Sequence, residues 1–419
     1  MSKQIVWHEC QKVWKSPIFL LLLFVFSVFD FFLIINNSYM KEELKIANEL
    51  AETYGLQITE ESLQLFEQAL QKDREQLVAI TGKKFSSVSE FFEQTTWEDF
   101  DSYSEVDKSL FRELELKEMY FQMAQSIDVY YDSLKIDSLA EDTIRMYGLS
   151  GKPAEMIRNE YIKLSDRFEE IKISEEHKQW AFAGAPYKMH SFLFRNIFGA
   201  LVFQALVLVV LTTAFITNYE VEHKTHLLSF STRRGRAFMK DKLIASLIMS
   251  LLMCLVLFGV TLACYFSVFS YTGLWDSPIS SAFNWEYTLP YITWRNIPFI
   301  QFLLLVTLLL MGCMLLFTLV VFTISVIVKN SYFTFFIFAI FFALGYLASG
   351  FMPTNSIFII FASFNLSVIV MNPHMLFSGQ NGLGTMFHNY EVITIVIWAF
   401  IVTVTSMLAY KYFQKQSIQ

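Results

Sequence analysis

Six long apolar runs restrict what this chain can fold into. About 20 consecutive apolar residues are enough for a helix to cross the hydrocarbon core of a bilayer. The sequence of 419 residues is 54% hydrophobic and contains 44 Phe, which is more apolar surface than a soluble chain of this length readily buries. We therefore predict an all-α membrane protein with six transmembrane helices, at residues 18–35, 193–217, 243–271, 299–328, 332–351 and 392–410.

The first apolar run has an alternative interpretation as a cleavable signal peptide, because Lys3, Lys12 and Lys15 precede it. A small-residue cleavage site would then be expected after the run, and none follows Ile35. We therefore predict that this run is the first transmembrane helix.

Lys and Arg residues near the ends of the apolar runs predict the orientation of the chain, since they favour the cytoplasmic side. They gather before the first run, between the second and third, after the fourth and after the sixth. This pattern predicts cytoplasmic termini, including a tail at 411–419. Three segments are then extracytoplasmic: 36–192, 272–298 and 352–391.

The segment 36–192 is predicted to be an acidic helical domain of four or five helices. It holds 31 Asp or Glu against 18 Lys or Arg, a net charge of −13. Three residues have the spacing of helix N-terminal caps: Thr59, Ser87 and Ser138. Four glycines separate the helical segments: Gly55, Gly82, Gly148 and Gly151.

The positions of the cysteines exclude disulfide bonds within this domain. All four cysteines lie outside it, at Cys10, Cys254, Cys264 and Cys313. The domain is therefore expected to depend on packing or on partners, without disulfides. The sequence also lacks the Cys and His spacing of a metal site.

Residues 1–17 are predicted to form an amphipathic elbow helix on the cytoplasmic side. One helical stripe carries Val6, Cys10, Val13, Trp14 and Pro17, opposite charged residues, as in helices that lie in a membrane interface. Pro17 favours a bend into the first transmembrane helix, because proline is tolerated at a helix start and restricts the residue before it.

The cytoplasmic loop 218–242 carries an ordered series of acidic, apolar and basic residues. In chain order they are Glu220, Glu222, Thr225, Leu227, Leu228, Arg233, Arg234 and Arg236, with Lys242 at the start of the next helix. This series resembles the coupling-helix signature of type-2 ABC transporter permeases, with Lys224 in place of the usual glycine. Such a helix can dock its leucines into a groove of a partner while its charges fix the orientation. An ordinary positive-inside loop is the alternative.

A short apolar stretch extends the resemblance. Residues 357–371 are too few to span a membrane and carry Asn365 at their centre, which predicts a re-entrant segment before the last helix. Type-2 permeases have re-entrant outer helices at this place. The resemblance thus covers the elbow, six helices, the loop and this segment, and implies a variant with a large extracytoplasmic insertion between the first and second transmembrane helices.

The resemblance implies the permease subunit of an ABC exporter, which works with ABC ATPase subunits and a second permease, identical or related. The chain lacks a phosphate-binding loop motif, so ATP and Mg would be bound by the partner ATPase, and this chain would carry no cofactor and no catalytic residue. The expected location is the plasma membrane of a Gram-positive bacterium, with membrane lipid as a further partner and no nucleic acid.

The apolar helices favour an apolar or amphipathic cargo, such as a peptide, an antibiotic or a lipid-like molecule. The alternative function is a membrane-anchored sensor or resistance protein whose outer domain binds a peptide. A membrane enzyme is disfavoured, because His8-Glu9 lacks a second histidine at metalloprotease spacing.

Asp30 and Arg195 are ionisable residues in the outer parts of the first two helices. An ionisable residue in a membrane normally needs a partner, so these two could form an intramembrane ion pair. Contact of Asp30 with a cation or with the cargo is the alternative.

Overall fold

The computed structural model describes residues 3–184, 190, 192–230, 235–286, 289–379 and 382–415. The chain is helical, with a two-stranded antiparallel hairpin of β1 (Trp285–Glu286) and β2 (Leu289–Pro290). Six helical segments are long and apolar enough to cross a membrane, which confirms the predicted number. They are α2 (Pro17–Asn36), η2 (Phe192–Ile197) with α11 (Phe198–Glu222), η3 (Gly235–Ala237) with α13 (Phe238–Val268), α14 (Phe299–Val328), α15 (Ser331–Leu347) with η4 (Ala348–Phe351), and α18 (Tyr390–Lys415).

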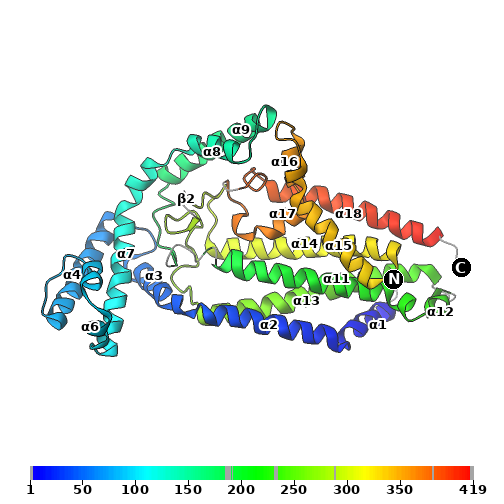
Figure 1. Ribbon diagram of the computed structural model, residues 1–419, viewed down its shortest axis with the longest axis horizontal. Helices are drawn as coiled ribbons and strands as arrows, with labels where there is room; N and C mark the ends of the chain where they lie inside the picture. The colour runs from blue at the N-terminus through cyan, green and yellow to red at the C-terminus, as the bar shows by residue number, and fades with distance from the viewer. Residues whose placement is uncertain are drawn as a thin grey trace.

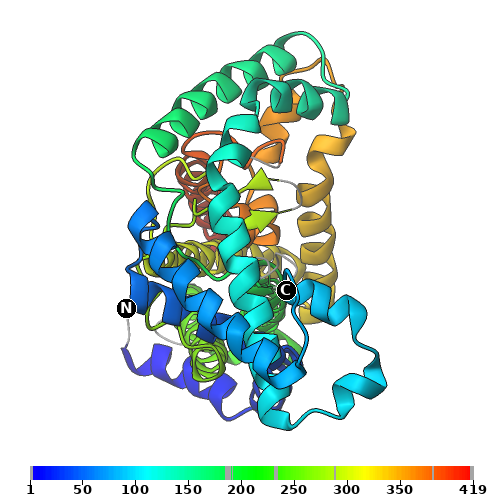
Figure 2. The same ribbon diagram turned by 90° about the vertical axis from the view of Figure 1, so that its left-hand side faces the viewer.

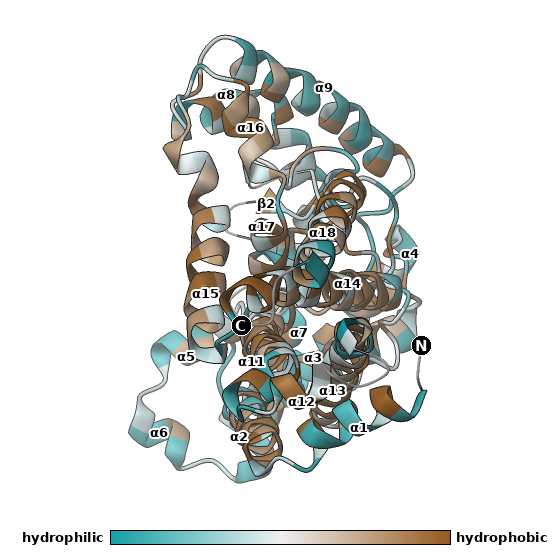
Figure 3. Ribbon diagram, turned by 90° about the vertical axis from the view of Figure 1, so that its right-hand side faces the viewer, coloured by the Kyte–Doolittle hydropathy of each residue, from teal (hydrophilic) through white to brown (hydrophobic). Residues whose placement is uncertain are grey.

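These six segments lie side by side along the long axis of the molecule (Figure 1). Helix α1 (Lys3–Trp14) and the end of α18 lie at one end of the bundle, here called the terminal end, and the helices of residues 41–173 lie at the other, the domain end. Helix α11 is mostly buried among α13, α14, α15 and α2, whereas the sides of α2 and α15 are largely exposed. Viewed from the terminal end, the bundle helices are hydrophobic along most of their length (Figure 3). Their exposed apolar faces suit contact with lipid.

At the domain end, η1 (Ser38–Met40) leads into seven helices between residues 41 and 173. They are α3 (Lys41–Tyr54), α4 (Glu60–Thr81), α5 (Val88–Gln94), α6 (Trp97–Asp101), α7 (Glu105–Ser133), α8 (Ile136–Met146) and α9 (Lys152–Ile173). The prediction of four or five helices was too low. The short helices α5 and α6 each have their own N-terminal cap, Ser87 and Thr96, and are too brief to give a periodic pattern.

The predicted helix starts were right at two of three positions. Thr59 accepts a hydrogen bond from Ser62 N, and Ser87 accepts one from Glu90 N, so both cap their helices. The prediction at Ser138 was wrong, because α8 already begins at Ile136 and the Ser138 hydroxyl donates back to Lys135 O. A serine within the first turn gives the same spacing signal as a cap.

The domain packs against the loops that join the bundle helices at this end. Figure 2 shows α7 and α9 lying across the end of the bundle. Arg167 of α9 forms an ion pair with Glu176 at 2.7 Å and donates from Nε to Thr293 O at 3.0 Å. Glu160 accepts a hydrogen bond from His388 N at 2.9 Å. Helix α9 is thereby attached to two separate loops of the bundle.

An aromatic cluster fills the space between the domain and the loop after α13. Trp180 is fully buried, with ring centroids 5.9 Å from Phe66, 6.3 Å from Tyr120 and 5.5 Å from Phe283. Aromatic rings in these edge and tilted arrangements contribute large buried areas. Packing of this kind accounts for a stable domain without disulfides.

Two short helices precede α18: α16 (Phe358–Ser363) and α17 (Leu366–Met371). Each has six residues, so neither can cross a membrane alone. Side chains bind the backbone at the break between them: Asn365 Oδ1 accepts from Val368 N, and Trp398 Nε1 donates to Phe364 O. Non-helical backbone at such a position needs these partners where water is excluded.

Replacing Arg167 with Ala is expected to destabilise the domain by about 3–5 kcal/mol, because it leaves the buried Glu176 carboxylate without its cation. The matched control is Arg158→Ala in the same helix as Arg167. It removes an exposed ion pair with Glu141 of α8 and should change stability little. Denaturant unfolding of the purified chain, followed by tryptophan fluorescence, measures both variants. Equal losses would contradict the role given to the Arg167–Glu176 pair.

Candidate functional site

The candidate site is the segment between α11 and α13 at the terminal end, together with the polar network beside it. After α11 ends at Glu222, the chain turns at Lys224, which has a φ of 58°. Helix α12 (His226–Phe230) follows, and η3 leads into α13. The loop predicted at 218–242 therefore includes a short helix of its own.

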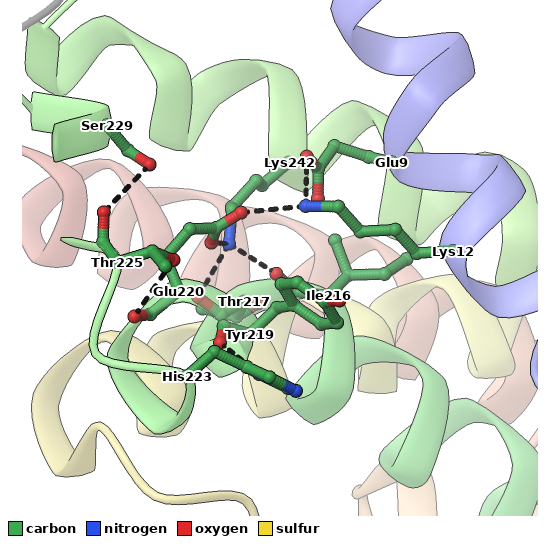
Figure 4. A network of polar contacts seen from close by, with 10 residues as sticks. All are labelled: Glu9, Lys12, Ile216, Thr217, Tyr219, Glu220, His223, Thr225, Ser229 and Lys242. Atoms are coloured by element: carbon green, nitrogen blue, oxygen red, sulfur yellow. Dashed lines mark hydrogen bonds and ion pairs between the residues drawn. The ribbon is translucent and has the colours of Figure 1, made fainter.

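Four charged side chains form a network beside this loop (Figure 4). Lys12 Nζ of α1 (Lys3–Trp14) lies 2.7 Å from both Glu9 Oε1 and Glu220 Oε1. Lys242 Nζ of α13 binds Glu220 Oε2 and also donates to Ile216 O at 2.5 Å and Thr217 O at 3.1 Å. The network thus joins α1, α11 and α13 through side chains that are far apart in sequence.

The network is buried, so its charges must balance each other. Lys242 is only 1% exposed, and Glu9 and Glu220 are also buried. Burial raises the pKa of Glu9 above its ordinary value, although Lys242 and Lys12 act against this effect. For Lys12, burial alone would lower the pKa, but Glu220 and Glu9 together raise it. Two ammonium groups facing two carboxylates hold three helices in one arrangement.

Glu222 contacts a fourth helix. Its Oε1 accepts a hydrogen bond from Ser331 N, 2.7 Å away, at the first residue of α15. The first N–H groups of a helix have no partner within the helix, and a carboxylate there also interacts favourably with the helix dipole. Asn330 caps the same turn by accepting from Phe333 N. Glu222 therefore attaches the end of α11 to the start of α15.

Helix α12 is held at its start and exposes its leucines. Thr225 N donates to Glu220 O at 2.8 Å, and Ser229 N donates to Thr225 O at 3.1 Å. Leu227 is 54% exposed and Leu228 is 78% exposed. Five residues cannot form a stable helix alone, so these connections to α11 fix the position of the two leucines.

The basic part of the loop is attached to the last helix. Arg236 Nη1 donates a hydrogen bond to Gln414 O, which connects η3 to α18. The predicted site residues Arg233 and Arg234 lie outside the described residues.

The structure thus separates the predicted loop residues by role. Glu220, Glu222 and Arg236 bind other parts of the chain. Thr225 forms hydrogen bonds within the loop, and Leu227 and Leu228 are exposed. Sequence reasoning missed the network of Glu220 with Glu9, Lys12 and Lys242. The i,i+3 spacing of Glu9 and Lys12 was the only local signal, and it cannot reveal a partner 208 residues away.

Asp30 has partners other than the one suggested by its charge. Its Oδ1 accepts from Gln204 Nε2 and its Oδ2 from Thr261 Oγ1, both at 2.7 Å. The Arg195 guanidinium is not among these partners. Among the described residues, no group of three or more His, Cys, Asp or Glu side chains is placed to hold a metal ion.

Replacing Lys242 with Met is expected to cost about 3–5 kcal/mol of stability, since Glu220 would keep its burial and lose one of its two cations. Lys240→Met, at an exposed position of the same helix, is the matched control and should have little effect. The double variant Lys242→Met/Glu220→Gln should recover part of the loss, because it also removes the unpaired charge. Thermal unfolding in detergent measures all three, and no recovery in the double variant would contradict the pairing.

Comparisons with protein-family models, with curated proteins and with solved structures found no match. A functional assignment for this chain therefore depends on its sequence pattern and on the geometry of the loop and network.

Proposed function

We propose that the chain is the permease subunit of an ABC exporter and that α12 docks into a separate ATPase subunit. The observation that carries this proposal is a five-residue helix with two exposed leucines, attached through the turn before it to a buried charge network. A docking helix must transmit force to the bundle, and the connections of this loop to α1, α11, α13, α15 and α18 give it the means to do so.

The backbone at Lys224 also supports the resemblance to type-2 permeases. Its φ of 58° lies in the left-handed region, which glycine adopts more readily than any other residue. The family signature has glycine at this position. A lysine there keeps the turn at a cost of about 1–2 kcal/mol.

The proposed orientation places the terminal end in the cytoplasm and the domain end outside, in a plasma membrane. Basic residues gather at the terminal end, while the domain end carries the acidic segment. In this orientation α1 is the elbow helix, with exposed Trp7 and Trp14 at the membrane interface. Helices α16 and α17 are the re-entrant segment.

The proposed partners are two ABC ATPase subunits and a second permease, with ATP and Mg held by the ATPase. The exposed apolar faces of α2 and α15 are available for the second permease and for lipid. Nucleotide-driven closure of the ATPase subunits would move α12 and shift the bundle between two arrangements. The proposed cargo is apolar or amphipathic, in keeping with the composition of the bundle.

The double variant Leu227→Asp/Leu228→Asp is expected to abolish copurification of ATPase activity with the chain, because two charges would enter an apolar groove. Ile173→Asp is the matched control, since Ile173 is 83% exposed but lies at the end of α9. The measurement is affinity purification in detergent, an ATPase assay and identification of the copurified proteins.

Equal elution of the variants in size-exclusion chromatography would show that both still fold. Copurified ATPase activity that survives the double variant would contradict docking through α12. A wild-type chain that carries no ATPase under conditions that preserve membrane complexes would favour a sensor with a peptide-binding outer domain.

A further inference from the structure

Asp30 is a carboxyl group buried where α2, α11 and α13 meet, and it is 1% exposed. Its two hydrogen bonds come from neutral donors, the Gln204 amide and the Thr261 hydroxyl. Neutral donors orient a carboxylate but supply no positive charge. An ionised carboxylate in an apolar medium is costly unless a counter-charge lies beside it.

The helices around Asp30 bring no such counter-charge close to it in the described part of the chain. Asp30 is the sole ionisable residue of α2. The ionisable residues of the helices packed around it are Tyr39 in η1; Arg195 in η2; Tyr219, Glu220 and Glu222 in α11; Lys240, Asp241, Lys242, Cys254, Cys264 and Tyr265 in α13; and Lys3, His8, Glu9, Cys10 and Lys12 in α1.

The cations of this set lie at other levels of the bundle. Arg195 precedes Gln204 by nine residues, which corresponds to about 13 Å along a helix. Lys242 precedes Thr261 by 19 residues, about 28 Å along α13. Lys12 and Lys242 are bound to Glu220 in the network at the terminal end. The negative charge of an ionised Asp30 would therefore stay uncompensated in this arrangement.

Two hydrogen-bonding features beside Asp30 leave places for a further proton. Gln204 is 3% exposed, and its Oε1, on the amide that binds Asp30, has no donor among the described residues. Thr261 gives its hydroxyl proton to Asp30, whereas five other threonines of the bundle donate to the carbonyl four residues earlier: Thr318, Thr323, Thr334, Thr394 and Thr405.

A proton on Asp30 fits the Thr261 contact in one arrangement and gives Gln204 Oε1 a donor in another, in both cases without further space. The acid O–H can donate from Oδ2 to Thr261 Oγ1, whose own proton is then free for the carbonyl of Leu257, one turn back. The other oxygen continues to accept from Gln204 Nε2. If the Gln204 amide is rotated, its oxygen can instead accept the acid proton, since amide O and N occupy nearly equivalent positions.

We propose that Asp30 is a proton-binding site, neutral while α2, α11 and α13 are packed together and ionised when water enters between them from the domain end. On release, the O–H bond breaks, its electron pair stays on the carboxylate, and the proton passes to water. Asp30 lies six residues before the end of α2, about 9 Å from the domain end of that helix. Opening of the bundle on that side would therefore release one proton per chain there.

This inference goes beyond the transport function and does not depend on the ATPase, so the full chain alone in lipid nanodiscs serves for the test. Infrared spectroscopy distinguishes the C=O stretch of a carboxylic acid from that of a carboxylate. The wild type at pH 7 should show an acid band that is absent in Asp30→Asn. Gln204→Leu and Thr261→Val should each shift that band, because each removes one hydrogen bond to the Asp30 carboxyl group.

Glu391→Gln is the matched control, since Glu391 is a second buried carboxyl at the start of α18. It should leave the Asp30 band unchanged. The thermal unfolding midpoint of Asp30→Asn should stay close to that of wild type, because the amide resembles the neutral acid in shape and charge.

Two results would overturn the proposal. Identical acid bands in wild type and Asp30→Asn would mean that Asp30 is ionised in the packed bundle. A rise in the unfolding midpoint of wild type on addition of sodium at fixed pH, lost in Asp30→Asn, would mean that the site takes a monovalent cation instead of a proton.

Discussion

The arrangement of the terminal end depends on the buried ion pair between Lys242 and Glu220 and on its extension to Lys12 and Glu9. Buried charges are costly to remove from water, and they are tolerated where each has an opposite charge and hydrogen bonds nearby. Here that requirement brings α1, α11 and α13 to one place. Three residues separate the end of α11 from the start of the short helix α12, so the position of α12 follows from the network.

The domain end is held by a different set of contacts. Arg167, Glu160 and the cluster around Trp180 join α9 and α4 to loops that follow α13 and α17. The domain is therefore attached to the loop after α13 and to the loop after α17, and movement of these two loops would be transmitted to α9. Between the two ends, Asp30 is a buried carboxyl with neutral partners. The molecule thus has ion pairs at both ends and, where α2, α11 and α13 meet, a buried carboxyl that we propose carries a proton.

Many of the helices could be predicted because their signals are local in the sequence. Apolar runs of sufficient length gave the six segments, and the caps at Thr59 and Ser87 marked two helix starts. The order of residues along the loop singled out Leu227 and Leu228, and both are exposed in the folded chain. Short helices such as α6 leave no periodic pattern, so their number was underestimated.

Contacts between distant parts of the chain could not be predicted from local patterns. The sequence indicated that Asp30 needs a partner, but charge alone suggested Arg195, while the folded chain offers Gln204 and Thr261. Glu222 was predicted to contact a partner subunit, and local patterns did not indicate that it also binds the start of α15. In both cases a polar side chain satisfies a requirement created by the packing of helices, which a single sequence does not reveal.

The most direct test of the central claim is photo-crosslinking in native membranes from a photoreactive residue placed at position 228. We expect a covalent adduct with a separate protein that carries a phosphate-binding loop, and no such adduct from the same residue at position 173. An adduct with lipid alone at position 228, or access to that position from outside intact cells, would contradict the account.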